Sequence, residues 1–300
     1  MKTILVTGGS GFIGRNLCQK LANLGNQLAV LSRSPIKAAK VLPNSVQVID
    51  DLNQLNQPVD ILINLAGEPI ADRRWSDKRK DTITQSRIQT TQKLYEHFKD
   101  AVKAPAIVIS GSAIGYYGGG TANNQQVAED GTVEPNFSSH LCAQWESAAQ
   151  QFASLGSRLC FLRTGIVLGK QGALSKLLPP FKLGLGGPIA TGRQWMPWVH
   201  IDDMVEIIIY AIQNDITGPI NCTAPQPVTN KEFSKTLGKV LRRPAVAPMP
   251  AVAVKLLFGQ MGDELMVQGQ CVIPQKLQQQ GFEFKYSDLQ SALGQLLNTK

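Results

Sequence analysis

The stretch Lys2-Thr-Ile-Leu-Val-Thr-Gly-Gly-Ser-Gly-Phe-Ile-Gly14 decides the fold. It contains a short apolar run, a glycine-rich turn and the start of an amphipathic helix over 13–21. A helix that starts so soon after its strand presents unpaired N–H groups and the positive end of its dipole. Such an end binds a pyrophosphate, and side chains at Gly8, Gly11 and Gly14 would keep that group away. In this setting the GxxGxxG spacing predicts a dinucleotide-binding turn rather than a glycine turn without a ligand.

Short apolar runs alternate with amphipathic segments through the first half of the chain, which is typical of βαβ units and a parallel sheet. The expected strands are Thr3–Thr7, Gln27–Leu31, Val46–Ile49, Ile61–Leu65, Ala106–Ser110 and Arg158–Leu162. Helices are expected to begin near Phe12, Lys37, Ser76 and Ser138. The predicted fold class is therefore α/β, with a doubly wound Rossmann sheet in residues 1–165 and one strand that returns near 219–223.

The second half, residues 166–300, is expected to form a smaller α/β region on the substrate side, with a small C-terminal domain at about 245–300. Pro179-Pro180 and the run 184–188 predict loops. Thr229 or Asn230 is expected to cap a helix that ends near Leu241. Beyond it we expect helices at Ala251–Phe258, Asp263–Gly269, Pro274–Gln280 and Leu289–Leu297, and a strand at Phe282–Tyr286.

Composition limits the class of protein. The 300 residues are 43% hydrophobic and 17% charged, as in soluble globular proteins, and no apolar run reaches the length of a membrane span. A strand that begins at Thr3 leaves no room for a signal or transit peptide. Five cysteines without a CxxC pair predict buried thiols, and the three histidines show no metal-ligand spacing. We therefore expect no metal site and a location in the cytoplasm or an organelle stroma.

The net charge of +8 raises the question of nucleic-acid binding. The basic residues are spread along the chain, and the densest run, 73–80, borders the expected cofactor edge. An anionic cofactor and a polar or anionic small-molecule substrate explain this run, as does a solvated helix face. No nucleic-acid partner is expected.

The end of the second strand selects the cofactor. An acid at this position would bind the ribose 2′-hydroxyl of NAD, but the strand ends in Ser32-Arg33-Ser34. Arg33 offers a permanently charged donor fork for a 2′-phosphate, which favours NADP(H); the alternative is a solvated loop arginine. Asp51, after the third strand, is placed either to bind the adenine amino group or to lie in a solvated turn. The turn 64–67 is expected to line the ribose and the nicotinamide.

These residues resemble the extended short-chain dehydrogenase/reductase superfamily, and within it the atypical branch of epimerase family proteins with a small C-terminal domain. The resemblance runs nearly end to end and rests on segments 6–14, 64–69, 74–75, 86–87, 145–146, 183–188, 198–203, 273–277 and 281–286. It implies an NADP(H)-binding Rossmann domain whose substrate cleft is built by the C-terminal third. By position, the cofactor contacts would be Gly8, Ser10, Gly11, Phe12, Ile13, Ser32, Arg33, Leu65, Ala66 and Arg87, beside Gly14 and Gly67 of the two turns.

The same resemblance shows where the chemistry departs from the family. Related enzymes use a serine after strand five and a YxxxK pair on the next helix, with the lysine lowering the pKa of the tyrosine. Ser112 takes the place of the serine, but counting back from Glu146 puts Ser138 at the tyrosine position and Cys142 at the lysine position. The serine hydroxyl cannot replace the tyrosine as a proton donor, and the cysteine thiol cannot replace the lysine as its cationic partner. Tyr116 is the alternative proton donor.

Tyr117 is a second candidate for that role, and both tyrosines have loop packing as the competing interpretation. Other candidate acids or bases are Glu68, Arg74 and His200. His200 stands at the head of a helix that Asp202 or Asp203 is expected to cap, which is the position of a structural or substrate-shell residue. The expected substrate cleft is lined by Glu68, Arg74, Trp75, Ser112, Tyr116, Trp195 and His200.

Two functions remain open from the sequence. The first is an NADP(H)-dependent oxidoreductase or epimerase that acts on a polar, sugar-nucleotide-like molecule. The second is a non-catalytic NADPH-binding regulator, for example in cell or plastid division, which the missing tyrosine and lysine favour.

Overall fold

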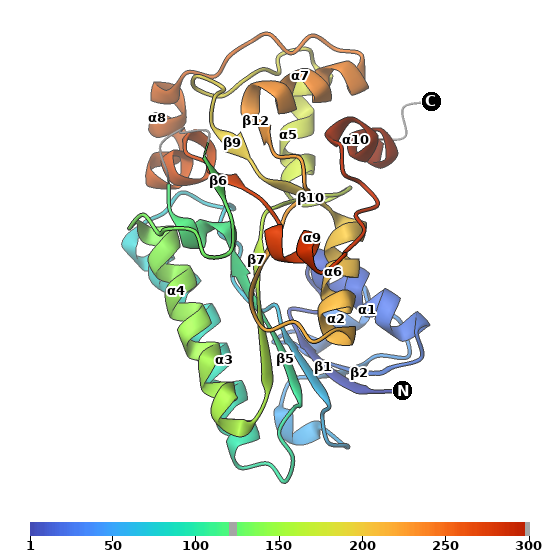
Figure 1. The fold of residues 1–300 in the computed structure, drawn as a ribbon. Helices are drawn as coiled ribbons and strands as arrows, with labels where there is room; N and C mark the ends of the chain where they lie inside the picture. Colours follow the sequence, from blue (N-terminus) through green and yellow to red (C-terminus); the bar gives the residue numbers. More distant parts are fainter. Residues whose placement is uncertain (120–124, 298–300) are drawn as a thin grey trace.

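The computed structural model describes residues 1–119 and 125–297, and its centre is a seven-stranded parallel sheet of order β11-β7-β5-β4-β1-β2-β3 (Figure 1). The strands are β1 (Thr3–Thr7), β2 (Gln27–Leu31), β3 (Gln47–Ile49), β4 (Ile61–Asn64), β5 (Ile107–Ala113), β7 (Arg158–Thr164) and β11 (Gly218–Cys222). This is the doubly wound order, with the chain crossing from β3 over β1 to β4. The expected fold class is confirmed, and β11 is the strand that returns to the sheet.

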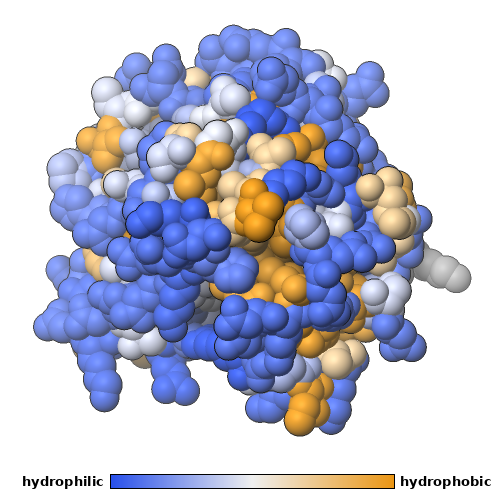
Figure 2. Space-filling model, turned by 90° about the horizontal axis from the view of Figure 1, so that it is seen from below, coloured by the Kyte–Doolittle hydropathy of each residue, from blue (hydrophilic) through white to orange (hydrophobic). Residues whose placement is uncertain are grey.

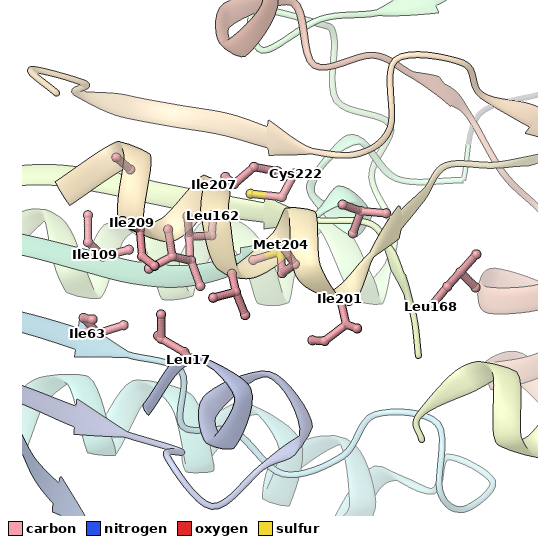
Figure 3. Packing of buried hydrophobic residues seen from close by; sticks show 14 of the residues in the cluster. Leu17, Ile63, Ile109, Leu162, Leu168, Ile201, Met204, Ile207, Ile209 and Cys222 are labelled. Atoms are coloured by element: carbon pink, nitrogen blue, oxygen red, sulfur yellow. The ribbon is translucent and has the colours of Figure 1, made fainter. Parts of the chain in front are cut away.

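Helices cover both faces of the sheet because successive strand residues point to opposite sides. Ile4 and Val6 of β1 pack in one cluster with α1 (Phe12–Asn23) and α6 (Ile201–Gln213). Leu5 packs in a second cluster with α3 (Asp77–Lys99) and α4 (Phe137–Gln150). Figure 3 shows part of the first cluster, with Ile209 of α6 beside Leu162 of β7 and Ile109 of β5. The sheet is therefore buried on both faces, and its carboxyl edge remains for a site.

Apart from β11, which joins the sheet, and α6, which packs on its face, most of the second half of the chain gathers above that carboxyl edge (Figure 1). Its elements are β8 (Ile166–Leu168), α5 (Ala173–Lys182), β9 (Trp195–Met196), β10 (Trp198–His200), β12 (Val228–Thr229), α7 (Asn230–Leu241), α8 (Ala251–Gly262), η4 (Asp263–Val267), β13 (Cys271–Val272), α9 (Gln275–Gln279) and α10 (Leu289–Leu297). The first half adds α2 (Pro35–Ala39), β6 (Gln126–Val127) and the short 3₁₀ turns η1 (Leu52–Gln54), η2 (Ile114–Tyr117) and η3 (Gln151–Leu155). β13 pairs with β6, so the C-terminal segment is tied to the loop that follows β5. None of the helices in the described residues combines the length and apolar character needed to cross a membrane.

Two expectations about the second half are wrong. Pro179 and Pro180 lie inside α5 and not in a loop. Their rings remove helical hydrogen bonds to the carbonyls of Ser175 and Lys176, but both residues are exposed, so water can satisfy those carbonyls. Burial of Leu174 and Phe181 on the same helix stabilises it against this loss.

The segment Phe282–Tyr286 is not a strand. The N–H groups of Lys285 and Tyr286 donate to the Asp203 carboxylate at 2.9 and 3.0 Å, so a side chain replaces the neighbouring strand. The aromatic residues of the segment pack on α6 and on each other, with Phe282 5.3 Å from Tyr210 between ring centroids. Apolar alternation here reflects packing against a helix and not sheet pairing.

The predicted helix starts near Ser76 and at Thr229 are confirmed. Ser76 caps α3 by accepting from the Arg79 N–H, and Thr229 caps α7 in a capping box with Glu232.

All five cysteines are free and buried. Burial raises the pKa of the Cys18 and Cys160 thiols to about 12, so both stay protonated.

Candidate cofactor and substrate site

The glycine turn joins β1 to α1 at the carboxyl edge, and its glycines have different roles. A Cβ on Gly8 would lie 2.6 Å from the Leu65 carbonyl oxygen, and one on Gly14 would lie 2.2 Å from the Gly8 oxygen. A Cβ on Gly9 would meet Val30 at 2.7 Å. These three glycines are therefore required by the packing of the protein itself, a requirement that adds to the expected approach of a ligand at Gly8 and Gly14.

Gly11 is the glycine that faces outward. Ser10 and Gly11 are exposed, and a Cβ on Gly11 would approach only the Gly8 oxygen, at 3.1 Å. No side chain caps α1 at Gly11. The first N–H groups of α1 thus meet an open side of the turn, which is the arrangement that binds phosphate. Phe12 and Ile13 begin the helix half-buried, with the Phe12 ring against Gly169.

A charged group lies at the end of β2, beside this turn. The Arg33 side chain is 88% exposed, and its one ion pair with the residues that the structure describes is a long one, 3.6 Å, with Glu68. Ser32 is half-buried, and its Oγ accepts from the Ser34 N–H at 3.2 Å. Asp51 follows β3, where its carboxylate accepts from the Asn53 N–H at 2.8 Å and stays exposed. The guanidinium of Arg33 is free to meet an anion.

The turn after β4 forms the next wall of the site. Leu65 and Ala66 donate backbone hydrogen bonds to the main chain and the hydroxyl of Thr7, at 3.1 and 3.2 Å. Glu68 pairs with Arg79 at 2.9 Å, and this hydrogen bond holds the pKa of the Glu68 carboxyl below its usual value. The residues predicted for this turn therefore lie together, next to the glycine turn.

Arg87 is not a surface arginine of α3. Its Nη1 donates to the carbonyl oxygens of Glu68 and Ile83 at 3.1 and 2.9 Å, and its Cζ lies 5.1 Å from the centroid of the Trp145 ring. A Cβ on Gly67 would lie 2.8 Å from that Cζ. Burial lowers the pKa of Arg87 from its ordinary value, although the group stays charged. Arg87 holds the turn after β4 against α4.

Ser112 belongs to a buried polar network that the sequence did not predict. Its Oγ donates to Glu146 at 2.7 Å. Both oxygens of Glu146 accept from Arg163, at 2.9 and 3.0 Å, and the Arg163 side chain is 4% exposed. Arg163 also donates to the Tyr117 hydroxyl at 3.0 Å. A bidentate buried pair of this kind is strong and fixed in orientation.

The two tyrosines after β5 differ in what they can do. Tyr117 is fully buried and donates to Asn221 at 2.7 Å, and desolvation raises its pKa to about 12. It is a structural residue, as the packing interpretation held. The half-buried Tyr116 ring lies over the guanidinium of Arg163, with Cζ 3.4 Å from the ring centroid.

The positions of the missing tyrosine and lysine lie on α4. Ser138 Oγ donates to Glu264 Oε2 at 2.6 Å, and the Ser138 N–H donates to the same oxygen at 3.1 Å. Cys142 is buried one turn further along, and desolvation raises its pKa to about 11. Glu264 comes from η4 in the C-terminal region. Nothing near Glu264 in the sequence marks it as part of the site.

Three further residues predicted for the substrate cleft, Trp75, Arg74 and Trp195, differ in their burial and in their hydrogen-bond partners. Trp75 is buried against Phe137, and its indole N–H donates to the Ile70 carbonyl at 2.8 Å. Arg74 is exposed and donates to the Leu256 carbonyl of α8 at 3.2 Å. Trp195 is half-buried, and its indole nitrogen has no hydrogen-bond partner among the residues described. Of these three, Trp195 has the polar atom that a ligand could satisfy.

His200 caps α6 itself, which corrects the expectation that Asp202 or Asp203 caps it. Its Nδ1 accepts from the Asp202 N–H at 3.1 Å, so Nε2 carries the proton and donates to Gln295 at 3.1 Å. The ring lies on Tyr286 with centroids 3.8 Å apart. Desolvation lowers the pKa of His200, so the residue is neutral and structural.

A second concave region lies at the opposite end of the strands from the glycine turn and has mostly apolar walls. A cavity of about 350 Å³ opens at the amino ends of β1, β4 and β5, and its walls include Ile4, Leu21, Ile61 and Ile209. Figure 2 looks at this lower face, where apolar side chains gather among charged ones. Ligands of doubly wound folds bind at the carboxyl ends of the strands. The glycine turn, Arg33 and Ser112 all lie at that carboxyl end.

Comparison with known proteins shows the family to which this fold belongs. Residues 4–222 match the model of the NAD dependent epimerase/dehydratase family. The chain belongs to this family. Residues 249–296 match a domain of unknown function (DUF1731), so this family member carries a second, uncharacterised unit that contains Glu264.

Relatives of the chain cover its full length. Epimerase family protein YfhF of Bacillus subtilis is 38% identical over 98% of this chain and 97% of its own. The crystal structure of human epimerase family protein SDR39U1 (isoform 2) with NADPH aligns with a TM-score of 0.89 and 33% identity, over 99% of this chain and 100% of that one. A nucleoside-diphosphate sugar epimerase from Corynebacterium glutamicum aligns with a TM-score of 0.78 and 27% identity, over 99% of this chain and 58% of that one.

Proposed function

We propose that this family member binds NADP(H) and uses it to oxidise and reduce a hydroxyl-bearing substrate, as an oxidoreductase or a sugar-nucleotide epimerase. The observation that carries the proposal is the open N-terminus of α1 at Gly11, with the exposed guanidinium of Arg33 beside it. The NADPH in the human relative supports the choice of cofactor.

The residues present fit this cofactor. The first N–H groups of α1 would hold the pyrophosphate, and Arg33 with Ser32 would hold the 2′-phosphate. The turn of Leu65, Ala66 and Gly67, held by Arg87, would line the nicotinamide side. A bound nicotinamide supplies hydride transfer, and the protein supplies orientation and the movement of protons.

The substrate is proposed to be a sugar nucleotide or a similar polar molecule. The Corynebacterium relative supports this class. On this chain, Ser112 and the indole N–H of Trp195 are polar groups able to contact sugar hydroxyls, and aromatic surface suits the apolar face of a sugar ring. Ser112 donates its own proton to Glu146 and therefore has acceptor capacity left for a substrate hydroxyl.

Thermal shift in the presence of NADPH or NADH tests the cofactor. A ligand that binds only the folded state raises its stability, and NADPH should raise the melting temperature more than NADH does. A larger shift with NADH would overturn the assignment of Arg33.

Incubation of the protein with a pool of metabolites that includes UDP-sugars tests turnover, in one sample loaded with NADPH and in another loaded with NADP⁺. With NADPH, a fall in absorbance at 340 nm would show reduction of a substrate. With NADP⁺, which can accept a hydride from a sugar hydroxyl and return it, comparison of the sugars before and after would show epimerisation without net oxidation. The alternative function, an NADPH-binding regulator, is favoured by Ser138 and Cys142 at the positions of the tyrosine and lysine. NADPH binding without any change in the pool would support that alternative.

A further inference from the structure

The C-terminal domain places a carboxylate at the position where α4 lacks its tyrosine. Glu264 Oε2 accepts two hydrogen bonds from Ser138, one from Oγ at 2.6 Å and one from the backbone N–H at 3.1 Å. Serine ends well short of the point that a tyrosine hydroxyl would reach. The Glu264 carboxylate lies in the space beyond the serine hydroxyl.

The neighbours of Ser138 connect this carboxylate to the end of β5. A Cβ on Gly115 would lie 3.1 Å from the Ser138 Cβ and 3.8 Å from the Cys142 sulfur. Gly115 belongs to the turn that directly follows Ser112 and Ala113. The first turn of α4 therefore faces the segment that carries Ser112, and Glu264 lies beside it.

Glu264 is held in one orientation by its own element. Gln260 Nε2 donates to Glu264 Oε1 at 2.9 Å. Met261 and Leu265, on either side of Glu264, pack with Trp75 and Leu141 in an apolar cluster between α3, α4 and the C-terminal domain. Residues 263–267 form a single π-helical turn, a conformation found often at functional sites.

The electrostatic setting of Glu264 differs from that of Glu146. Glu146 is locked in a bidentate pair with Arg163. Glu264 receives hydrogen bonds from the neutral groups of Ser138 and Gln260, and no lysine, arginine or histidine forms an ion pair with it among the described residues. Of these two carboxylates, Glu146 of α4 is engaged in an ion pair, and Glu264 of η4 has only neutral hydrogen-bond donors.

We propose that Glu264 is the acid–base residue of this protein and replaces the absent tyrosine. The inference rests on the proposed function. When a substrate alcohol is oxidised, its O–H bond breaks and the proton moves to Glu264 Oε2, while the carbon hydrogen leaves with both electrons of the C–H bond as a hydride for the nicotinamide of NADP⁺. Reduction reverses each transfer, with protonated Glu264 as the acid. The domain of unknown function thus completes the active site.

The affinities for NADP⁺ and NADPH test the placement of Glu264 without a substrate. A carboxylate beside the nicotinamide attracts the positively charged oxidised ring and not the neutral reduced one. Glu264→Gln should therefore weaken the binding of NADP⁺ by roughly 3- to 10-fold relative to the binding of NADPH, as expected for the loss of one screened charge contact. The exposed Glu283 of the same domain provides a matched control, since Glu283→Gln removes the same charge and should leave the ratio unchanged. Titration of tryptophan and NADPH fluorescence measures both affinities.

The pH dependence of the ratio of NADP⁺ affinity to NADPH affinity tests the protonation of Glu264. In the wild-type protein this ratio should fall at low pH, as the carboxylate gains a proton and loses its charge. In Glu264→Gln the ratio should not change with pH. Glu264→Asp keeps the charge and should retain most of the wild-type ratio, which keeps the test valid if the glutamine variant does not fold. A ratio that is equal in wild type and Glu264→Gln at every pH overturns the proposal.

Turnover then separates this inference from the proposed function. In the incubation with the UDP-sugar pool, Glu264→Gln should slow the reaction at least about 100-fold, the usual contribution of a general acid or base. Equal rates in the two proteins would overturn the role of Glu264 and leave the proposed function standing. Failure of the wild-type protein to bind NADP(H) would overturn the proposed function itself.

Discussion

The first βαβ unit and the start of α4 lie at the same edge of one sheet, yet they relate to the family in opposite ways. The first unit has the glycine turn, an uncapped helix start and an exposed Arg33, which match what the resemblance to the family predicts for a cofactor site. The start of α4 has Ser138 and Cys142 where related enzymes use tyrosine and lysine. Cofactor binding and proton transfer are therefore separable properties of this fold. A chain with the features of a cofactor site need not have the tyrosine and lysine that usually transfer the proton.

The two regions also differ in how charge is handled. Arg33 is exposed and nearly unpaired, as a group that awaits an anionic ligand must be. Arg163, behind α4, is buried and fully engaged with Glu146 and Tyr117. The first arginine is the one that we propose contributes to cofactor binding, and the second contributes to the architecture of the site. Four changes probe the glycine turn, these two arginines and the cap of α6, from the largest expected effect to the smallest.

Gly14→Ala should unfold or severely destabilise the protein, by more than about 4 kcal/mol, because its Cβ would lie 2.2 Å from a backbone oxygen that cannot move aside. Gly294→Ala is the matched control, since a Cβ there, also in a helix, meets nothing within 4 Å. It should be neutral or stabilising by up to about 1 kcal/mol. Urea unfolding followed by circular dichroism measures both. Similar curves for the two variants would show that the turn is less tightly packed than the structure indicates.

Glu146→Gln should reduce the free energy of unfolding by about 3–5 kcal/mol, because Arg163 would remain buried without a counter-charge. Glu134→Gln, at an exposed position of the preceding loop, removes the same charge and should have little effect. Thermal or urea unfolding compares the two. A loss below about 1 kcal/mol for Glu146→Gln would place this pair with ordinary surface ion pairs.

Arg33→Ala should weaken NADPH binding by about 10- to 100-fold, or about 1.5–3 kcal/mol, through the loss of charged hydrogen bonds to the 2′-phosphate. NADH has no such phosphate and should bind the variant as it binds the wild type. Lys37→Ala removes an exposed charge from the same end of β2 and should leave the preference for NADPH intact. Calorimetric titration with both cofactors decides between a specific contact and a general effect of charge.

His200 should make the protein less stable at mildly acidic pH. Desolvation lowers its folded pKa below the unfolded value of about 6.5, so the unfolded state gains a proton first. The stabilisation is complete above pH 6.5 and is lost as the pH falls through the folded pKa. His200→Asn can still cap α6 and should flatten the melting temperature between pH 7 and 5, whereas exposed His140→Asn should not. Parallel curves for His200→Asn and wild type would contradict this assignment.

Several features of this protein could be predicted from the sequence because they depend on residues close together in the chain. The parallel sheet follows from the alternation of apolar runs, and the glycine turn, Ser32 and Arg33 fall within one βαβ unit. The caps at Ser76 and Thr229 are equally local, since each bonds a backbone group three residues away. In each case the pattern and the contact it predicts lie within a few turns of the chain.

Only the tertiary structure decided the polar contacts that give the site its character. Glu146 meets Arg163 at a separation of 17 residues, across α4 and β7, and Ser138 meets Glu264 at a separation of 126 residues. The Asp203 carboxylate replaces a strand at Lys285 and Tyr286 in the same long-range way. Periodicity and spacing describe the local backbone and contain no information about which distant side chain a folded chain brings into hydrogen-bonding range. For that reason the sequence determined where the cofactor turn lies, while the fold determined which carboxylate stands in for the missing tyrosine.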